Sequence, residues 1–222
     1  MTPVKKMRPR DAASLILLRG DDRDTKVLMG RREPRQSFMP GVFVFPGGAV
    51  DRSDGFVRSS DELRPDVLAA ISATCTAHRA RAIALAGIRE TWEETGLMLG
   101  RPSGAASRTP VSWRAFTAAG LAPTLGGLDY IARAVTPPGP PRRFHARFFL
   151  SRSAETVGSL SGNGELLDLD WYPLQTAFGL PIAGVTQLVL KEVAQIVSGA
   201  AAASTAIPFF TRHGGRRMIS YD

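Results

Sequence analysis

Cysteine and histidine are scarce in this 222-residue chain, and their scarcity excludes two kinds of site. Cys75 is the one cysteine, so no disulfide forms within the chain, which fits a reducing compartment. The histidines are His78, His145 and His213, and no second Cys/His pair accompanies Cys75 and His78, which argues against zinc. Long apolar runs are also missing, since none approaches the roughly 20 residues that cross a bilayer. We therefore expect a protein of the cytoplasm with no membrane partner.

Acidic residues are in the minority. Lysine and arginine number 28 against 20 aspartates and glutamates, which gives a net charge of +8. Such a balance is compatible with a nucleic-acid partner. The arginines are scattered, however, and aromatic residues do not interleave with them as a base-stacking surface requires. Attraction of a small phosphorylated substrate and an ordinary solvated surface are the alternatives, and nucleic acid is not an expected partner.

Apolar periodicity and turn residues give an outline of the fold. Residues 1–11 read as a flexible lead, and the clearest helix is 79–95, which is alanine-rich and ends at a glycine. Further helices are expected at 65–78 and 186–203. The expected strands are 12–19, 26–30, 42–45, 128–135, 144–150 and 166–172. No linker divides the chain, so the outline predicts one α+β domain, an α/β/α sandwich around a mixed β-sheet.

Carboxylates crowd the end of the 79–95 helix, in Arg89-Glu90-Thr91-Trp92-Glu93-Glu94-Thr95-Gly96-Leu97. Glu90 is three positions from Glu93 and four from Glu94, so the three acids share one arc of the helix. Like charges at these spacings destabilise a helix by roughly 0.2–0.5 kcal/mol per pair. The helix dipole adds about 0.3–1 kcal/mol for each acid near the C-terminus. A bound divalent cation would offset these costs, and oxygen ligands on a rigid helix suit Mg²⁺ or Mn²⁺.

A second unusual stretch, Phe45-Pro46-Gly47-Gly48-Ala49-Val50-Asp51, follows a short predicted strand. Its two glycines allow the backbone to pass close to another group. Each stretch alone has an ordinary explanation, a solvated acidic face for one and a tight turn for the other. Taken together they are far more specific.

The two stretches together resemble the Nudix box, whose pattern is G-x5-E-x7-R-E-U-x-E-E-x-G-U with U aliphatic. Gly48 begins the pattern and residues 89–97 end it, with Thr91 at a usually aliphatic position. Asp54 stands at the first box glutamate, but 34 residues instead of seven separate it from Arg89. The box is thus split by an insertion of 27 residues, and Asp54 is left out of the predicted site. Residues 55–78 make up most of the insertion, and we expect them to be helical and to shape the substrate pocket.

A split box is similar to that of one Nudix subgroup, which includes mammalian peroxisomal coenzyme A diphosphatases. The resemblance covers about residues 12–196, although a longer coenzyme A motif known in other Nudix diphosphatases is not evident. Other stretches similar to the subgroup are Phe38-Met39-Pro40-Gly41, Thr136-Pro137, Arg143-Phe144 and Phe148-Phe149.

The resemblance implies a Nudix fold and the metal-dependent hydrolysis of a diphosphate joined to another moiety, with Mg²⁺ or Mn²⁺ as cofactor. Glu90, Glu93 and Glu94 would form the metal and base cluster, with Glu90 and Glu94 the preferred ligands and Arg89 orienting a glutamate. The main-chain carbonyl at Gly48, or at the residue after it, would complete the metal shell.

Other side chains are candidates for substrate contacts or a further acid. Glu165, in a Gly-Asn-Gly-Glu loop, is the leading additional carboxylate, with an ordinary solvated loop acid as the alternative. The arginines that could bind substrate phosphates are Arg31, Arg32, Arg142, Arg143 and Arg147, each with a plain surface role as the alternative.

Three functions compete. The first is a pyrophosphohydrolase acting on a nucleoside diphosphate derivative, with coenzyme A or its esters ranked before ADP-ribose or NADH. The second is a non-catalytic Nudix module that senses a nucleotide, which gives no reason for three clustered acids. The third is a nucleic-acid-binding protein, which has net charge alone in its favour. A homodimer is left open.

Overall fold

The computed structural model describes residues 7–21, 24–36, 39–104, 109–140, 142–152, 156–200, 207–213 and 216–221. Residues 1–6 of the predicted lead, Phe38, and residues 201–203 of the last predicted helix lie outside these ranges. Within the described part of the chain, no helix is long and apolar enough to cross a membrane.

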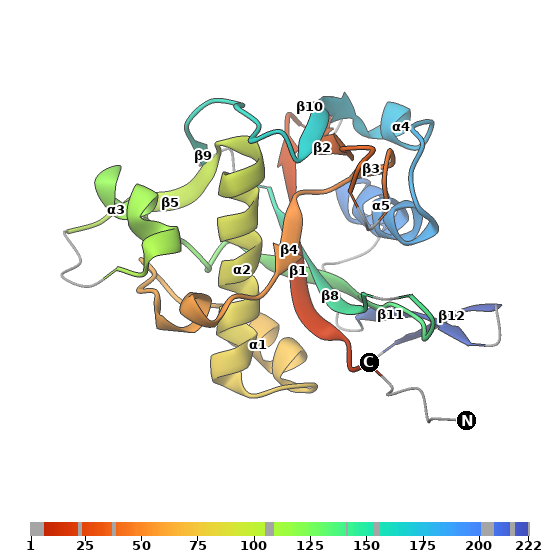
Figure 1. Cartoon of the computed structure of the whole chain (residues 1–222), viewed down its shortest axis with the longest axis horizontal. Helices are drawn as coiled ribbons and strands as arrows, with labels where there is room; N and C mark the ends of the chain where they lie inside the picture. Colours follow the sequence, from red (N-terminus) through yellow and green to blue (C-terminus); the bar gives the residue numbers. More distant parts are fainter. Residues whose placement is uncertain are drawn as a thin grey trace.

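A nine-stranded mixed sheet forms the centre of the molecule (Figure 1). Its order is β10-β2-β1-β8-β7-β11-β12, with β3 paired to β2 and β4 paired to β1. Neighbouring strands are antiparallel except for the pairs β1–β8 and β7–β11, which are parallel. Its strands are β1 (Arg10–Arg19), β2 (Lys26–Arg32), β3 (Phe43–Val44), β4 (Gly47–Ala49), β7 (Asp129–Val135), β8 (Phe144–Ser151), β10 (Leu166–Pro173), β11 (Pro208–His213) and β12 (Arg216–Tyr221).

Two helices cover opposite faces of this sheet, and β1 explains why. Side chains alternate along a strand, so Leu15 and Leu17 join the core under α2 (Ala77–Thr95). Ile16 and Leu18 turn the other way, into the core under α5 (Gly184–Val197). Figure 1 shows α2 and α5 on the two sides of β1 and β8. The predicted α+β sandwich around a mixed sheet is confirmed.

The remaining elements lie at the edges of this sandwich. A small sheet has the order β6-β5-β9. The other elements are β5 (Met98–Pro102), β6 (Leu121–Pro123), β9 (Thr156–Val157), the 3-10 turns η1 (Arg52–Phe56) and η2 (Val111–Trp113), and the helices α1 (Pro65–Ser72), α3 (Arg114–Ala118) and α4 (Leu174–Ala177).

The box insertion is only partly helical. α1 ends at Ser72, because Thr76 then accepts a hydrogen bond from the Arg79 N–H (3.3 Å) and starts α2 at Ala77, two residues earlier than expected. α1 packs against α2 and β7, with Val67 and Ile71 buried in the core under α2. In Figure 1 it lies beside the lower half of α2. The helix therefore supports the core beneath the N-terminal half of α2.

Two element boundaries also differ from expectation at the ends of the chain. β1 begins at Arg10, within the predicted lead, because Arg10 pairs with Phe144 of β8 and donates its N–H to the Arg143 carbonyl (2.9 Å). α5 ends at Val197, because Gly199 follows with a left-handed φ of 72°.

Candidate active site

The last turns of α2 carry the acidic stretch and end it sharply. Gly96 adopts a left-handed φ of 75°, and its N–H donates to the Trp92 carbonyl (2.8 Å). Thr91, at the usually aliphatic box position, is fully buried. Its hydroxyl donates to the Gly87 carbonyl (2.7 Å), so the polar group is satisfied inside the helix. The sequence departure at Thr91 therefore leaves the helix intact.

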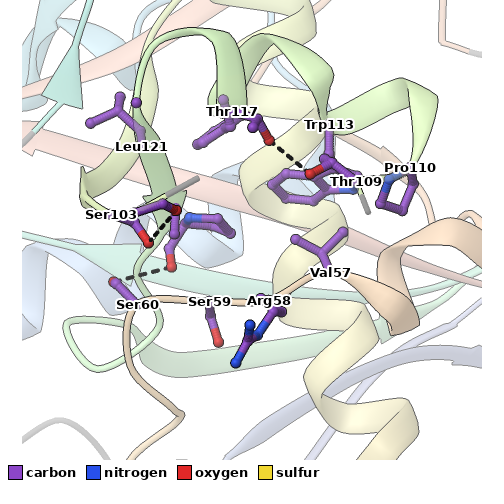
Figure 2. Close-up of a pocket in the computed structure, with 15 residues that line it drawn as sticks. Val57, Arg58, Ser59, Ser60, Ser103, Thr109, Pro110, Trp113, Thr117 and Leu121 are labelled. Atoms are coloured by element: carbon purple, nitrogen blue, oxygen red, sulfur yellow. Dashed lines mark hydrogen bonds between the residues drawn. The ribbon is translucent and has the colours of Figure 1, made fainter. Parts of the chain in front are cut away.

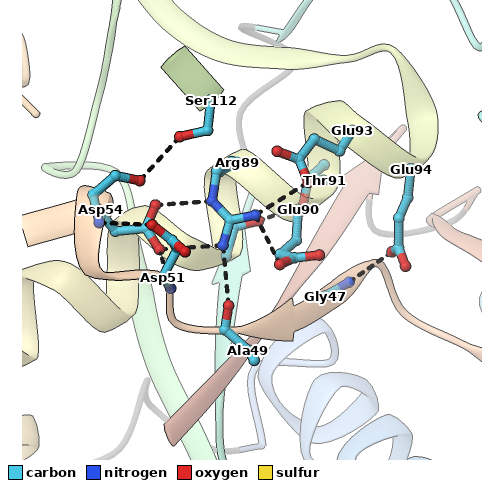
Figure 3. A network of polar contacts seen from close by, with 12 residues as sticks. Gly47, Ala49, Asp51, Asp54, Arg89, Glu90, Thr91, Glu93, Glu94 and Ser112 are labelled. Carbon is cyan, nitrogen blue, oxygen red and sulfur yellow. Dashed lines mark hydrogen bonds and ion pairs between the residues drawn. The ribbon is translucent and has the colours of Figure 1, made fainter. Parts of the chain in front are cut away.

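β4 brings the glycine stretch against these acids. The Gly47 N–H donates to Glu94 Oε2 (2.8 Å). A Cβ at Gly48 would lie 2.4 Å from the carboxyl carbon of Glu90, closer than real Cβ contacts come. Only a glycine leaves room for the Glu90 carboxylate at this point of the strand. The two stretches singled out in the sequence thus meet in space (Figure 3).

Arg89 lies at the centre of a buried network. Its guanidinium pairs with Asp54 through two bonds (2.8 and 3.2 Å) and donates to Glu90 Oε1 (2.8 Å) and Glu93 Oε2 (3.1 Å). It also donates to the Ala49 carbonyl (3.0 Å), which ties the helix to β4. The Arg89 side chain is 6% exposed. One arginine therefore holds two acids of the helix in fixed positions relative to β4 (Figure 3).

Asp54 is a site residue that the sequence prediction left out. It is fully buried and caps η1, accepting the Asp51 N–H (2.8 Å) at the same carboxylate that binds Arg89. It also accepts the indole N–H of Trp113 (3.1 Å). The available signal was its place six positions after Gly48, which is the G-x5-E spacing of the box. The 34-residue gap before Arg89 hid this signal, because an insertion lengthens the sequence between two residues that can still lie side by side in the fold.

Trp113 is a second residue that no sequence pattern indicated. It is fully buried on η2 and forms a wall of a pocket of ~490 Å³ (Figure 2). Hydroxyl groups around this pocket bond to the protein itself: Thr109 pairs with Thr117 (2.9 Å), and Ser60 donates to the Pro123 carbonyl (3.2 Å). The pocket therefore offers few unused polar groups, and Trp113 connects it to Asp54.

Glu94 is buried and Glu90 is mostly buried, and both have too little positive charge around them to keep their pKa values at the ordinary level. Burial raises the pKa of Glu94 to about 8, against the opposing effect of the Gly47 N–H. Burial also raises the pKa of Glu90, although the Arg89 charge opposes it. The ion pairs of Arg89 outweigh its desolvation, so its pKa is raised. Additional positive charge near Glu94 and Glu90 would favour their ionised forms.

The donor set fits a hard divalent cation by its chemistry. Carboxylates and main-chain carbonyls are the ligands that Mg²⁺ and Mn²⁺ prefer. Among the residues that the structure describes, no three His, Cys, Asp or Glu side chains already stand in a metal-holding arrangement. Arg89 occupies one oxygen each of Glu90 and Glu93, and the Gly47 N–H occupies one of Glu94.

Glu165 and Arg32 lie on the Glu94 side of the site, whereas Arg31 alternates with Arg32 along β2 and turns toward the α5 face, with Met29. Burial, the Gly47 N–H and Glu90 have the largest effects on the pKa of Glu94. Smaller effects come from Arg32, which lowers this pKa, and from Glu165, which raises it. Glu165 is exposed, and its carbonyl accepts the Glu33 N–H (3.1 Å). Arg31 pairs with Asp168 (2.7 Å) across the β2–β10 edge.

The structure gives three other predicted arginines different surroundings. Arg143 donates to the carbonyls of Thr136 (3.1 Å) and Met7 (2.6 Å), so it anchors the start of β1. Arg147 is buried and bonds to Asp11 and to the Thr74 hydroxyl. Arg142 is exposed just before β8. None of the three contacts the acidic network around Arg89.

Comparisons with known proteins agree on one family. No family model matches the chain. The crystal structure of a NUDIX hydrolase from Alicyclobacillus acidocaldarius is 32% identical, covers 90% of this chain and 97% of its own, and superposes with a TM-score of 0.64. The MutT protein from Bacillus halodurans is 14% identical with 96% of both chains covered and a TM-score of 0.51, a likeness in fold.

A curated relative matches a shorter part. The Caenorhabditis elegans protein called nudix hydrolase 7 is 35% identical over 89 residues, which are 40% of this chain and 22% of that protein. The match therefore spans about a fifth of the relative's length.

Proposed function

Because the chain belongs to the Nudix hydrolase superfamily, we propose that it hydrolyses the diphosphate linkage of a nucleoside diphosphate joined to another moiety. The observation that carries this proposal is the Arg89 network beside Gly47 and Gly48, with the buried Glu94 at its edge. A binding module without chemistry has no need for a buried carboxylate whose charge must be compensated.

In this mechanism Glu90 and Glu94 would hold Mg²⁺ or Mn²⁺, together with the main-chain carbonyl of Gly48. The Ala49 carbonyl accepts a hydrogen bond from Arg89 (3.0 Å), and Gly48 pairs with Ala13 of β1. The bound ion would neutralise charge on the diphosphate and lower the pKa of the attacking water.

The protein's own groups supply orientation and proton transfer. Arg89 fixes the Glu90 and Glu93 carboxylates through one guanidinium nitrogen (2.8 and 3.1 Å). The Glu93 side chain is the more exposed of the two, at 33%, and is the proposed general base that accepts the proton of the attacking water. Glu165 would add a carboxylate from the loop before β10, and Arg32, whose charge lowers the pKa of Glu94, would contact substrate phosphates.

Coenzyme A or its esters are the proposed substrates. The support is the split box itself, together with the similar stretches on either side of it. ADP-ribose and NADH carry the same diphosphate linkage and are the next candidates. The broader assignment, diphosphate hydrolysis, does not depend on this choice.

A substrate panel tests the proposal. The protein is incubated with Mg²⁺ or Mn²⁺ and with coenzyme A, ADP-ribose, NADH or a dinucleoside polyphosphate, and products are separated by chromatography. We expect metal-dependent release of two phosphorylated products and a loss of at least about 100-fold in Glu94→Gln. Glu192→Gln, the same change at a partly buried acid on α5, should retain activity. Absence of turnover on every member would overturn the proposal.

A further inference from the structure

A second cleft, of ~520 Å³, lies where the box insertion begins. It is lined by the start of β1, the chain that leaves β4, and the first turns of α2. The residues that matter most in its lining are Arg10, Arg52, Phe56, His78 and Arg79. Glu90, Glu93 and Glu94 do not line it. It is therefore separate from the acidic network, and no part of the proposed hydrolysis uses it.

The lining carries more positive than negative charge. Asp11 is matched by two arginines, since it pairs with Arg79 (2.8 Å) and with the buried Arg147. Asp51 accepts the Ser53 N–H (2.7 Å) and so faces its own turn.

Arg10 and Arg52 supply the excess positive charge. Both are exposed. After the hydrogen bonds from Ser53, the Arg10 charge also lowers the pKa of Asp51, but no ion pair joins either arginine to a carboxylate in the described part of the chain. Two such guanidinium groups on one cleft favour a phosphate, which accepts several charge-assisted hydrogen bonds at once.

An aromatic side chain completes the cleft. Phe56 is 66% exposed, which is unusual for a large apolar residue beside a polar surface. Its ring meets His78 edge to face, with 6.3 Å between ring centroids. Gly55 permits this arrangement, because a Cβ there would lie 2.8 Å from the His78 ring. An exposed aromatic face next to cationic groups is suited to stacking a nucleobase.

Only a short stretch of chain separates Gly48 from the lining of the cleft. Asp51 lies three residues beyond Gly48, and an extended chain advances by about 3.3 Å per residue, so roughly 10 Å separates the two places. One ligand could therefore place its diphosphate at the acidic network and its base, with a further phosphate, in the cleft.

We propose that this cleft binds the phosphorylated nucleoside end of the substrate, with Arg10 and Arg52 on a ribose phosphate monoester and Phe56 against the base. The inference rests on the proposed function and names its substrate class, a nucleoside that carries a phosphate monoester besides the diphosphate. Coenzyme A has this chemistry, and dephospho-coenzyme A and ADP-ribose lack the monoester.

Kinetics with matched substrates test the cleft. For wild-type protein, kcat/KM should be at least about 10-fold higher for coenzyme A than for dephospho-coenzyme A, because the dephospho form lacks the charge-assisted contacts to the monoester. Arg52→Gln and Arg10→Gln should each raise KM for coenzyme A, leave kcat near wild type, and leave dephospho-coenzyme A unaffected. Arg58→Gln changes an exposed arginine of the same insertion outside this cleft and should alter neither substrate.

A binding measurement separates this inference from the proposed hydrolysis. Adenosine 3′,5′-bisphosphate contains no diphosphate linkage, and its binding to metal-free protein is measured by calorimetry. If the wild-type protein binds this compound, the binding weakens in Arg52→Gln and in Phe56→Ser, and no substrate is turned over, the proposed role of the cleft stands and the proposed hydrolysis is overturned. Turnover without preference for coenzyme A over its dephospho form would overturn the cleft alone. If the folded wild-type protein neither binds this compound nor turns over any substrate, both the cleft proposal and the hydrolysis proposal are overturned.

Discussion

Asp54 and Arg89 are 35 positions apart in the sequence and form a buried, two-bonded ion pair. The two bonds measure 2.8 and 3.2 Å, and the Asp54 side chain is fully buried. The pair joins the start of the insertion to the helix that carries the acids. Arg89 would otherwise be a buried cation held mainly by Glu90 and Glu93, the residues proposed to bind metal and accept a proton.

Asp54→Asn should destabilise the protein strongly. Removing one partner of a buried pair leaves an uncompensated charge, which costs about 3–5 kcal/mol. Because Arg89 keeps three other acceptors, we expect a loss near the lower limit, measured by urea denaturation. Asp66→Asn, which breaks an exposed pair with Arg64, should leave the unfolding midpoint close to wild type. Equal effects of the two changes would contradict the role of Asp54.

Trp113→Phe should weaken the site while the ring stays in place. The change removes the indole N–H that Asp54 accepts (3.1 Å), and a hydrogen bond to a charged group contributes about 1.5–3 kcal/mol. We expect a lower kcat with an unchanged KM, measured on the best substrate. Trp92→Phe alters a neighbouring ring that contacts Phe116 and should change kcat much less.

Gly48→Ala should displace the Glu90 carboxylate. The added Cβ would lie 2.4 Å from the carboxyl carbon, so the side chain or the strand must move. We expect Mn²⁺ affinity to fall by about 10–100-fold, as for other changes that misplace a ligand, in a calorimetric titration. Gly127→Ala meets no atom within 4 Å and is the matched control. Unchanged Mn²⁺ affinity in Gly48→Ala would remove Glu90 from the ligand set.

Glu94→Gln should stabilise the metal-free protein as pH rises. The pKa of Glu94 is about 8 in the folded chain and about 4.3 when unfolded. A raised acid pKa means that wild-type stability falls as pH climbs from the unfolded value to the folded one. The melting temperature of Glu94→Gln in EDTA should exceed that of wild type increasingly between pH 5 and pH 8. A constant difference across this range would contradict the buried acid.

Asp61 should matter for acid stability. Burial opposes its ionised form, but bonds from the Thr124 hydroxyl (2.7 Å) and the Gly126 N–H (3.1 Å) prevail, so its pKa is lowered. A lowered pKa gives a stabilisation that is present above the unfolded value of about 3.9 and lost as pH falls through the folded value. Asp61→Asn should thus be less stable than wild type at pH 6, with the difference shrinking below pH 4 in urea titrations.

Local patterns accounted for much of the fold and indicated that the glycine stretch and the acids of α2 belong together. The periodicity of α2, its closing Gly96 and the Gly47-Gly48 pair are encoded within a few residues, so they could be read directly. Asp54 could not, because its partner is fixed by the path of an insertion. Trp113 could not either, since a 3-10 turn carries no periodic signal. The position of Arg143 depends on which strand neighbours β8, and sequence does not reveal that pairing.

The anchored insertion has a consequence for the entropy of the unfolded chain. Closing a loop costs more as it lengthens, and lengthening the box gap from seven to 34 residues adds only ~1.4 kcal/mol on logarithmic scaling. Burial of one aliphatic side chain contributes about as much, and Val57, Leu63, Val67 and Ile71 are all buried. The insertion can therefore offset its own closure cost. This leaves its length free to vary in chains where the Asp54–Arg89 pair joins the same two ends.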